Sequence, residues 1–213
     1  MNSSADHAID GIADAQRRVG RERATLIAIS GIDASGKGHL ARKLAQGLRE
    51  RAYRVALVGV DGWLRLPQER FNAVDTARHF YSRAIRFEEM FQHLILPLRE
   101  RRSIEVQVDF TEETASSYRK EWYRFVDVDV ILLEGIFLLK KDYRHQYDLS
   151  IWIECSFETA LQRAVARAQE GLPPAETVRA YESIYFPAQR LHFQLDAPMR
   201  AANMVLHNDI LQG

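Results

Sequence analysis

Short apolar runs alternate with segments of helical periodicity along most of this 213-residue chain. The run at 128–133 is nearly continuous in hydrophobic residues, as in strands that are buried on both faces. Similar runs cover residues 24–30, 54–60 and 149–154, and a weaker one covers 202–206. Because helical segments separate them, these runs predict an α/β fold with a mainly parallel, five-stranded, doubly wound sheet.

The segments between the runs place apolar residues at every third or fourth position, as amphipathic helices do. The predicted helices cover residues 37–51, about 87–101, 157–167 and a segment that begins at 175. Ser156 is a suitable N-cap for the third helix, and Pro97 predicts that the second bends or ends early. Alternation of apolar and polar residues at 104–108 predicts a strand that is covered on one face only.

No Pro/Gly-rich linker divides the chain, so residues 21–213 are predicted to form a single domain. Residues 1–20 are predicted to form a polar helical extension before it. A stripe of four apolar residues could dock this helix on the domain. The stripe consists of Ile9, Ile12, Ala13 and Val19.

A glycine-rich loop directly follows the first apolar run and opens the helix at 37. We call residues 31–39 the phosphate loop. They are Gly31, Ile32, Asp33, Ala34, Ser35, Gly36, Lys37, Gly38 and His39. The pattern G-x-x-x-x-G-K predicts that backbone N–H groups at a helix N-terminus hold a polyphosphate, with Lys37 reaching the outer phosphates.

The residue after this lysine is glycine, where a hydroxyl residue is expected. That hydroxyl would bind Mg²⁺, so Gly38 predicts a weaker or rearranged metal site rather than a dead one, since Mg²⁺ usually keeps several waters and leans on substrate phosphates. Asp33 could contribute to the ion through water, or it could instead cap the loop or pair with Lys37.

Two acidic residues end apolar runs, at the edge of a parallel sheet where ligands bind. Asp61 could accept the proton of an attacking hydroxyl, or it could simply form a turn with Gly62. Glu134 could hold a Mg²⁺-bound water, or local backbone or an arginine could satisfy it. Asp61 is a second candidate for the metal site.

Three further groups of residues are candidates for transfer and acceptor binding. Arg163 and Arg167 share one helix face and could bring positive charge over the transferred phosphoryl group; the alternative is a solvated face paired with Glu158 or Glu170. The segment from Asp109 and Phe110 to Glu113 could be an acceptor-recognition loop, although an exposed acidic turn is the alternative. Aromatic residues at 79–81, including Tyr81, and at 122–123 could stack on an acceptor or belong to the core.

Composition narrows the class of protein. Lys+Arg and Asp+Glu both number 29, so the chain carries no net charge and gives no indication of a nucleic-acid partner. Its longest apolar segment, 130–139, is interrupted by Glu134 and falls short of the ~20 residues that a membrane span needs. A single cysteine and a polar, acidic start without the features of a signal peptide predict a cytoplasmic protein.

Taken together, these residues resemble the uridine kinase and phosphoribulokinase family of P-loop kinases, from residue 25 to about 209. The matching segments are the phosphate loop, the strand that ends at Asp61, Val108-Asp109-Phe110, residues 131–135, Arg163 with Arg167, and residues 181–187 and 202–205. The resemblance implies a P-loop NTPase fold, a three-layer α/β/α structure with a short lid and a small acceptor-binding insertion. It also implies a kinase that uses ATP and Mg²⁺, with Asp61 as general base.

The chain departs from the uridine kinase pattern at three places: Gly38 replaces the hydroxyl residue, Val108 and Glu113 stand where that family has a tyrosine and a histidine, and the lid at 169–172 lacks arginines.

A nucleoside is the default acceptor, and another small hydroxyl compound is the alternative. A nucleotide-binding sensor or scaffold without turnover is a second hypothesis. A switch GTPase is a weaker third one, because the Asn-Lys-x-Asp signature is missing. Whether the chain forms a homo-oligomer stays open.

Overall fold

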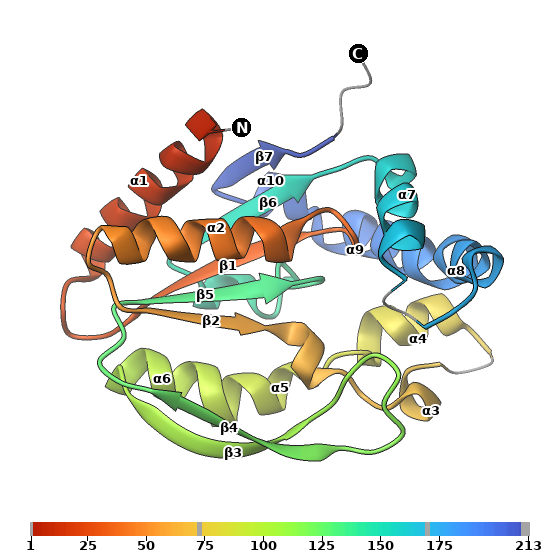
Figure 1. Cartoon of the computed structure of the whole chain (residues 1–213), viewed down its shortest axis with the longest axis horizontal. Helices are drawn as coiled ribbons and strands as arrows, with labels where there is room; N and C mark the ends of the chain where they lie inside the picture. The colour runs from red at the N-terminus through yellow and green to blue at the C-terminus, as the bar shows by residue number, and fades with distance from the viewer. Residues whose placement is uncertain (1, 72–73, 169–170, 210–213) are drawn as a thin grey trace.

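The computed structural model describes residues 2–71, 74–168 and 171–209. Five parallel strands form one sheet in the order β2-β5-β1-β6-β7 (Figure 1). Their bounds are Thr25–Gly31 (β1), Val55–Gly59 (β2), Val130–Gly135 (β5), Leu149–Glu154 (β6) and Met204–His207 (β7). The predicted α/β fold with a five-stranded parallel sheet is confirmed.

Helices cover both faces of this sheet. Their bounds are Asn2–Val19 (α1), Lys37–Glu50 (α2), Pro67–Arg70 (α3), Thr76–Arg83 (α4), Phe87–Met90 (α5), Leu96–Arg101 (α6), Phe157–Arg167 (α7), Pro174–Ala180 (α8), Phe186–Asp196 (α9) and Pro198–Ala201 (α10). Shorter 3₁₀ or π turns are Val60–Trp63 (η1), Phe91–Ile95 (η2), Arg144–Gln146 (η3) and Tyr181–Tyr185 (η4). No helix in the described part of the chain is both long and apolar enough to cross a membrane.

The central strand β1 is buried along its whole length and feeds two separate hydrophobic cores. Successive side chains of a strand point to opposite faces, so Leu26 and Ala28 join the core beneath α5 and α6. Ile27 and Ile29 join the other core, which α1 and α2 cover (Figure 1). This burial on both faces explains why the run lacks charged residues.

Helix α1 packs on this second core through the predicted stripe. Ile9, Ile12 and Ala13 are buried, and Val19 is partly exposed. The side chain of Ile9 lies so close to Gly47 that a Cβ atom added to the glycine would collide with it. Residues 2–19 therefore share the core of the sheet.

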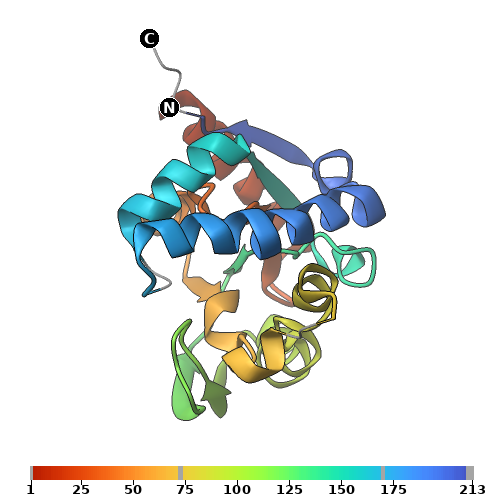
Figure 2. The same ribbon diagram turned by 90° about the vertical axis from the view of Figure 1, so that its right-hand side faces the viewer.

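Pro97 does not end the helix as predicted. Backbone stays helical from 87 to 101, with the π turn η2 directly before the proline. A proline has no N–H to donate to the carbonyl four residues earlier, and its ring clashes with that carbonyl. A π turn before the proline changes the hydrogen-bond spacing, so the helix can continue past it. The same arrangement occurs at Pro187, where η4 joins α8 to α9 as one long helix (Figure 2).

A two-stranded antiparallel hairpin lies outside the main sheet. The predicted strand at 104–108 extends over Ile104–Phe110 (β3) and pairs with Arg119–Phe125 (β4), which the sequence analysis did not predict. β4 consists of charged and aromatic residues, and four of its seven residues are exposed. Its partly buried Tyr123 and Phe125 pack against the core, and Tyr123 stacks on the ring of Trp63 at 6.4 Å between centroids.

Candidate active site

The phosphate loop joins β1 to α2 at the carboxyl edge of the sheet, in a conformation that requires glycine at position 36. Gly36 has φ +93°, and a Cβ atom there would collide with the amide of Asn208. That amide donates a hydrogen bond from Nδ2 to the carbonyl of Ser35 at 2.7 Å. Lys37 Nζ donates to the carbonyl of Ile32 at 2.8 Å. Contacts from β7 and from the lysine therefore shape the loop.

Gly38 faces the end of β5. A Cβ atom at this position would lie 3.8 Å and 4.0 Å from the two carboxylate oxygens of Glu134, and 3.5 Å from Nη1 of Arg42. These are ordinary van der Waals distances, so a side chain would fit. The guanidinium of Arg42, one helical turn further on, occupies the neighbouring space.

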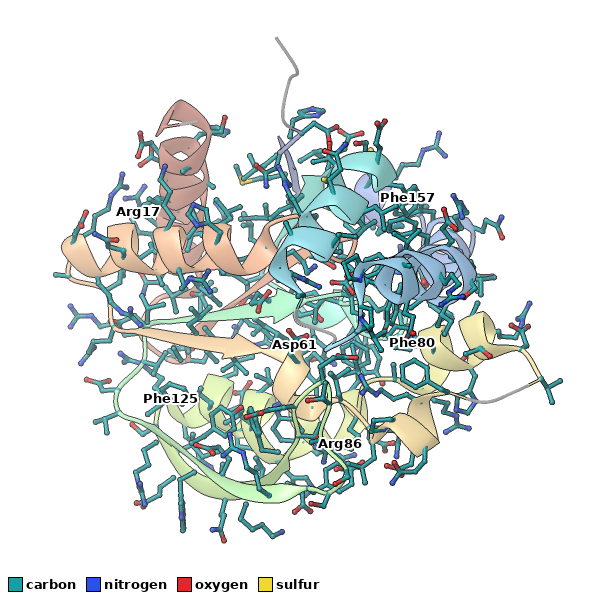
Figure 3. All side chains as sticks on the ribbon, turned by 45° about the vertical axis from the view of Figure 1, so that its right-hand side comes forward. Arg17, Asp61, Phe80, Arg86, Phe125 and Phe157 are labelled. Carbon is teal, nitrogen blue, oxygen red and sulfur yellow. The ribbon has the colours of Figure 1, made fainter. Side chains whose placement is uncertain are left out.

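Two of the predicted carboxylates lie side by side because their strands do. β2 pairs with β5, with Gly59 opposite Glu134, and Asp61 follows in η1. Figure 3 shows Asp61 at the end of the sheet, between the hairpin and the helices α7–α9. Asp61 is accessible and makes no side-chain hydrogen bond to the described residues. The turn-forming alternative does not account for this unpaired carboxylate.

Burial and mutual repulsion raise the pKa values of both groups. Burial raises the pKa of Glu134 to about 7; Lys37 opposes this rise, and the charge of Asp61 adds to it. The pKa of Asp61 is also raised, by burial first and by Asp33 second, while Lys37 and Arg167 lower it. Two carboxylates in a confined site with a lysine between them are a common feature of catalytic sites.

The side chains at this site provide only a few ligands for Mg²⁺. Within the described ranges, no three His, Cys, Asp or Glu side chains are arranged to hold a metal ion. Carboxylate oxygens suit Mg²⁺, which usually takes one or two of them together with phosphates and water. Glu134, with Asp61 as a second carboxylate, therefore fits an ion that arrives with a nucleotide rather than a resident ion.

Both predicted arginines reach the phosphate loop from α7, the helix that Ser156 caps as predicted. Nη2 of Arg163 donates to the carbonyl of Asn208 at 2.8 Å. Nη2 of Arg167 donates to Asp33 Oδ1 at 3.1 Å and to the Tyr181 hydroxyl at 2.9 Å. Neither arginine forms an ion pair with Glu158 in the described residues, and Glu170 lies outside them.

Residues Gln169 and Glu170 of the predicted lid also lie outside the described part of the chain, which resumes at Gly171.

One cavity of about 530 Å³ brings most of the predicted residues together. Its lining comes from the phosphate loop and α2, from the ends of β2 and β5, and from α7, with further residues that the sequence analysis did not assign. The lining residues are Asp33, Ala34, Gly36, Lys37, Gly38, His39, Arg42, Asp61, Leu64, Phe80, Glu113, Glu134, Ile136, Arg163, Arg167 and Tyr185.

The three predicted acceptor residues do not line this cavity. Asp109 pairs with Lys120 at 2.8 Å on the hairpin, where both side chains are exposed. The ring of Phe110 packs on Gly62. The Tyr81 hydroxyl donates to Asp196 at 2.6 Å. Asp109, Phe110 and Tyr81 therefore lie outside the lining of this cavity, and their role in acceptor binding stays a prediction.

Six lining residues were missed as site residues: Arg42, Leu64, Phe80, Glu113, Ile136 and Tyr185. Phe80 was within an aromatic segment that the sequence singled out, but its neighbour was chosen. Glu113 was within the candidate acceptor loop at 109–113, but other residues of that loop were chosen. Figure 3 shows Phe80 on the side of Asp61 toward the helices.

Comparison with known proteins agrees with this geometry. Residues 26–171 match the model of the "Phosphoribulokinase / Uridine kinase family". No curated protein sequence matches the chain.

Solved structures share the fold at low sequence identity. A possible uridine kinase from Bacillus stearothermophilus is 20% identical, with TM-score 0.71 over 92% of this chain and 97% of that one. D-glycerate 3-kinase from Cryptococcus neoformans is 11% identical, with TM-score 0.63 over 88% of each chain. Phosphoribulokinase from Rhodobacter spheroides is 12% identical, with TM-score 0.57 over 88% of this chain and 71% of that one.

The family match extends over more than half of the chain and includes the phosphate loop, Asp61 and Glu134, which the structure places around one cavity. The chain belongs to the phosphoribulokinase / uridine kinase family of P-loop kinases.

Proposed function

We propose that this protein is an ATP-dependent kinase that phosphorylates a hydroxyl group of a small molecule. One observation supports this most: the unpaired carboxylate of Asp61 lies in the same cavity as Lys37 and the phosphate loop. A group that can accept a proton is thus next to the groups that bind phosphates. The lone cysteine and the cytoplasmic prediction from the sequence suit an enzyme of small-molecule metabolism.

In the proposed reaction, the loop amides and Lys37 hold the triphosphate of ATP. The acceptor oxygen forms a bond to the γ-phosphorus while the bond from that phosphorus to the β–γ bridging oxygen breaks, and ADP leaves. Asp61 takes the proton of the attacking hydroxyl. Arg163 and Arg167 line the same cavity, where their charge can stabilise the transferred group.

Glu134 and Asp61 are the side chains that would hold Mg²⁺. When bound, the ion would neutralise charge on the phosphates. For the acceptor, the family resemblance makes a nucleoside of the uridine type the default, and the solved structures of similar fold include kinases named for other acceptors.

Asp61→Asn tests the proposal. Because an amide cannot take the proton, turnover should fall about 10²- to 10⁴-fold, while the affinity for ATP should stay within about threefold. Lys37→Ala is the matched variant on the phosphate side, and it should abolish ATP binding instead. Turnover is measured as ADP release in the presence of Mg²⁺ and acceptor, and affinity by calorimetry. Equal loss of turnover and of ATP affinity in Asp61→Asn would make Asp61 structural.

Gly38 favours the second hypothesis, a nucleotide-binding sensor without turnover, because no hydroxyl is available next to Glu134. Tight binding of ATP without transfer to any acceptor, also in Gly38→Thr, would support that hypothesis and refute the kinase.

A further inference from the structure

The part of the cavity around Asp61 and Glu113 has a chemical character of its own. These two carboxylates line it, and the charges of Lys37, Arg167 and the buried Arg70 act on Asp61 from nearby. Four apolar or aromatic side chains complete the wall: Leu64, Phe80, Ile136 and Tyr185. We call this part the acceptor end, because it surrounds the general base proposed above.

The cations that line the cavity come from two helices: Lys37 and Arg42 from α2, and Arg163 and Arg167 from α7. Lys37 and Arg163 donate to the carbonyls at 32 and 208, in the phosphate loop and directly after β7. Arg167 binds Asp33 of the loop and the hydroxyl of Tyr181. These hydrogen bonds hold Lys37, Arg163 and Arg167 beside the phosphate loop, where ATP would meet them.

The guanidinium of Arg70 lies behind the acceptor end and is not exposed to the cavity. Arg70, from α3, is fully buried and does not line the cavity. Its Nη1 donates to Oε1 of Glu113 at 2.8 Å, and its Nη2 donates to the carbonyl of the same residue at 2.6 Å. A compound in the cavity therefore meets the carboxylate of Glu113 and cannot reach the guanidinium behind it.

Glu113 is held in place and keeps one oxygen available. Oε2 makes no hydrogen bond within the described part of the chain, whereas Oε1 is bound by Arg70. Burial raises the pKa of Glu113; Arg70 opposes the rise, and the charges of Asp33 and Asp61 add to it. A third negative charge at this end would increase the repulsion, whereas hydroxyl donors would relieve it.

The apolar wall limits the acceptor further. Phe80 and Tyr185 are 3% and 5% exposed and pack edge to face, with 5.0 Å between ring centroids. Buried rings of this kind offer a rigid surface to the C–H face of a ring or chain. Hydroxyls on one side and C–H groups on the other are the combination that a polyhydroxylated compound presents.

We infer that the acceptor is an uncharged polyhydroxy compound, such as a sugar, a polyol or the ribose of a nucleoside, and that Glu113 selects it by accepting a hydroxyl hydrogen bond while Arg70 holds Glu113 in place. This inference rests on the proposed kinase function. It makes Glu113 a specificity residue and Arg70 a positioning residue. It excludes acceptors that carry a carboxylate or a phosphate.

The test pairs each neutral acceptor with a relative that carries an anionic group and keeps free hydroxyls: glycerol with glycerate, ribose with ribose 5-phosphate, and uridine with uridine 3′-monophosphate, with glucosamine as a cation. The unmodified protein is assayed with ATP and Mg²⁺ by product analysis. The neutral member of a pair should be favoured at least tenfold in kcat/KM, because a charged group would lie unpaired beside two carboxylates. Preference for an anionic acceptor or for the cation overturns the inference and leaves the kinase function intact. Binding of ATP without transfer to any acceptor refutes the kinase function, and the inference with it.

Glu113→Gln separates selection from catalysis. The amide weakens the hydrogen bond to the hydroxyl, so KM for the neutral acceptor should rise about tenfold, with kcat and KM for ATP within about twofold. The neighbouring Glu112→Gln is the control, since Glu112 is exposed and pairs only with Arg119 among the described residues. An unchanged acceptor KM in Glu113→Gln, or an equal rise in both variants, contradicts the role of Glu113. If Glu113→Gln fails to fold, the acceptor pairs on the unmodified protein still decide the inference.

Discussion

At the scale of single residues, position 38 is where this chain differs most from other P-loops. The missing side chain leaves Glu134 facing a glycine, with Arg42 beside it. A hydroxyl at this position would lie beside the carboxylate that is proposed to hold the ion. The difference is therefore expected to affect the metal more than the nucleotide.

Gly38→Ser should lower the Mg²⁺ concentration that gives half-maximal turnover. Its Cβ atom would sit at least 3.5 Å from its neighbours, so the loop can keep its shape. An added metal partner is worth on the order of 10-fold in affinity. Gly38→Ala supplies the same carbon without the oxygen and is the control. The measurement is turnover against Mg²⁺ concentration; the same shift in both variants would mean that the hydroxyl does not contribute.

Candidate site residues could be predicted from the sequence where they follow the ends of strands. Lys37, Asp61 and Glu134 each follow an apolar run, and parallel strands bring their carboxyl ends to one edge. Glu113 and Phe80 come from a segment after the hairpin strand and from a short helix, whose place depends on tertiary packing. The sequence placed both in candidate acceptor segments, at 109–113 and 79–81, but its periodicity does not indicate which residue of each segment faces the cavity.

At the scale of elements, α1 is the clearest case of a predicted stripe that packs as expected. Ile12 is fully buried between α1 and the sheet core, while Arg17 on the same helix is exposed. Conversely, β4 and the π turns could not be predicted. Charged residues interrupt the apolar pattern of β4, and Pro97 and Pro187 look like helix ends until a neighbouring turn accommodates them.

Ile12→Ala should lower the free energy of unfolding of the whole protein by about 2–5 kcal/mol, because it opens a cavity in the shared core. Urea denaturation followed by fluorescence and by circular dichroism measures the change. Arg17→Ala is the control and should change the free energy by less than about 0.5 kcal/mol. A loss below that value in Ile12→Ala would show that α1 is only loosely attached.

At the scale of the whole molecule, the carboxyl groups of the site lower the free energy of unfolding when they are charged. Asp61, Glu113 and Glu134 all have pKa values raised by burial. A carboxyl whose pKa is higher in the folded protein binds its proton more tightly there than in the unfolded chain. Such a carboxyl group stabilises the folded protein below its ordinary pKa. This stabilisation is lost as the pH rises through the raised pKa of the folded protein.

For Glu134 this loss should occur between pH 4.5, its ordinary value, and about 7. Glu134→Gln removes the titration, so the difference in unfolding free energy between pH 5 and pH 8 should shrink by on the order of 1–3 kcal/mol. Urea denaturation with chelator at both pH values measures it. Glu182→Gln, exposed on η4, is the control. The same pH dependence in Glu134→Gln and in the unmodified protein would contradict the raised pKa.

The hydrogen bond from Asn208 to the carbonyl of Ser35 spans 173 positions of the sequence. Synthesis on the ribosome proceeds from the amino terminus, so the glycine-rich segment is made well before this partner. A nascent chain arrested before β7 would contain Lys37 and lack the amide that fixes the adjacent turn. Nucleotide affinity should therefore be acquired only after residue 208 has emerged.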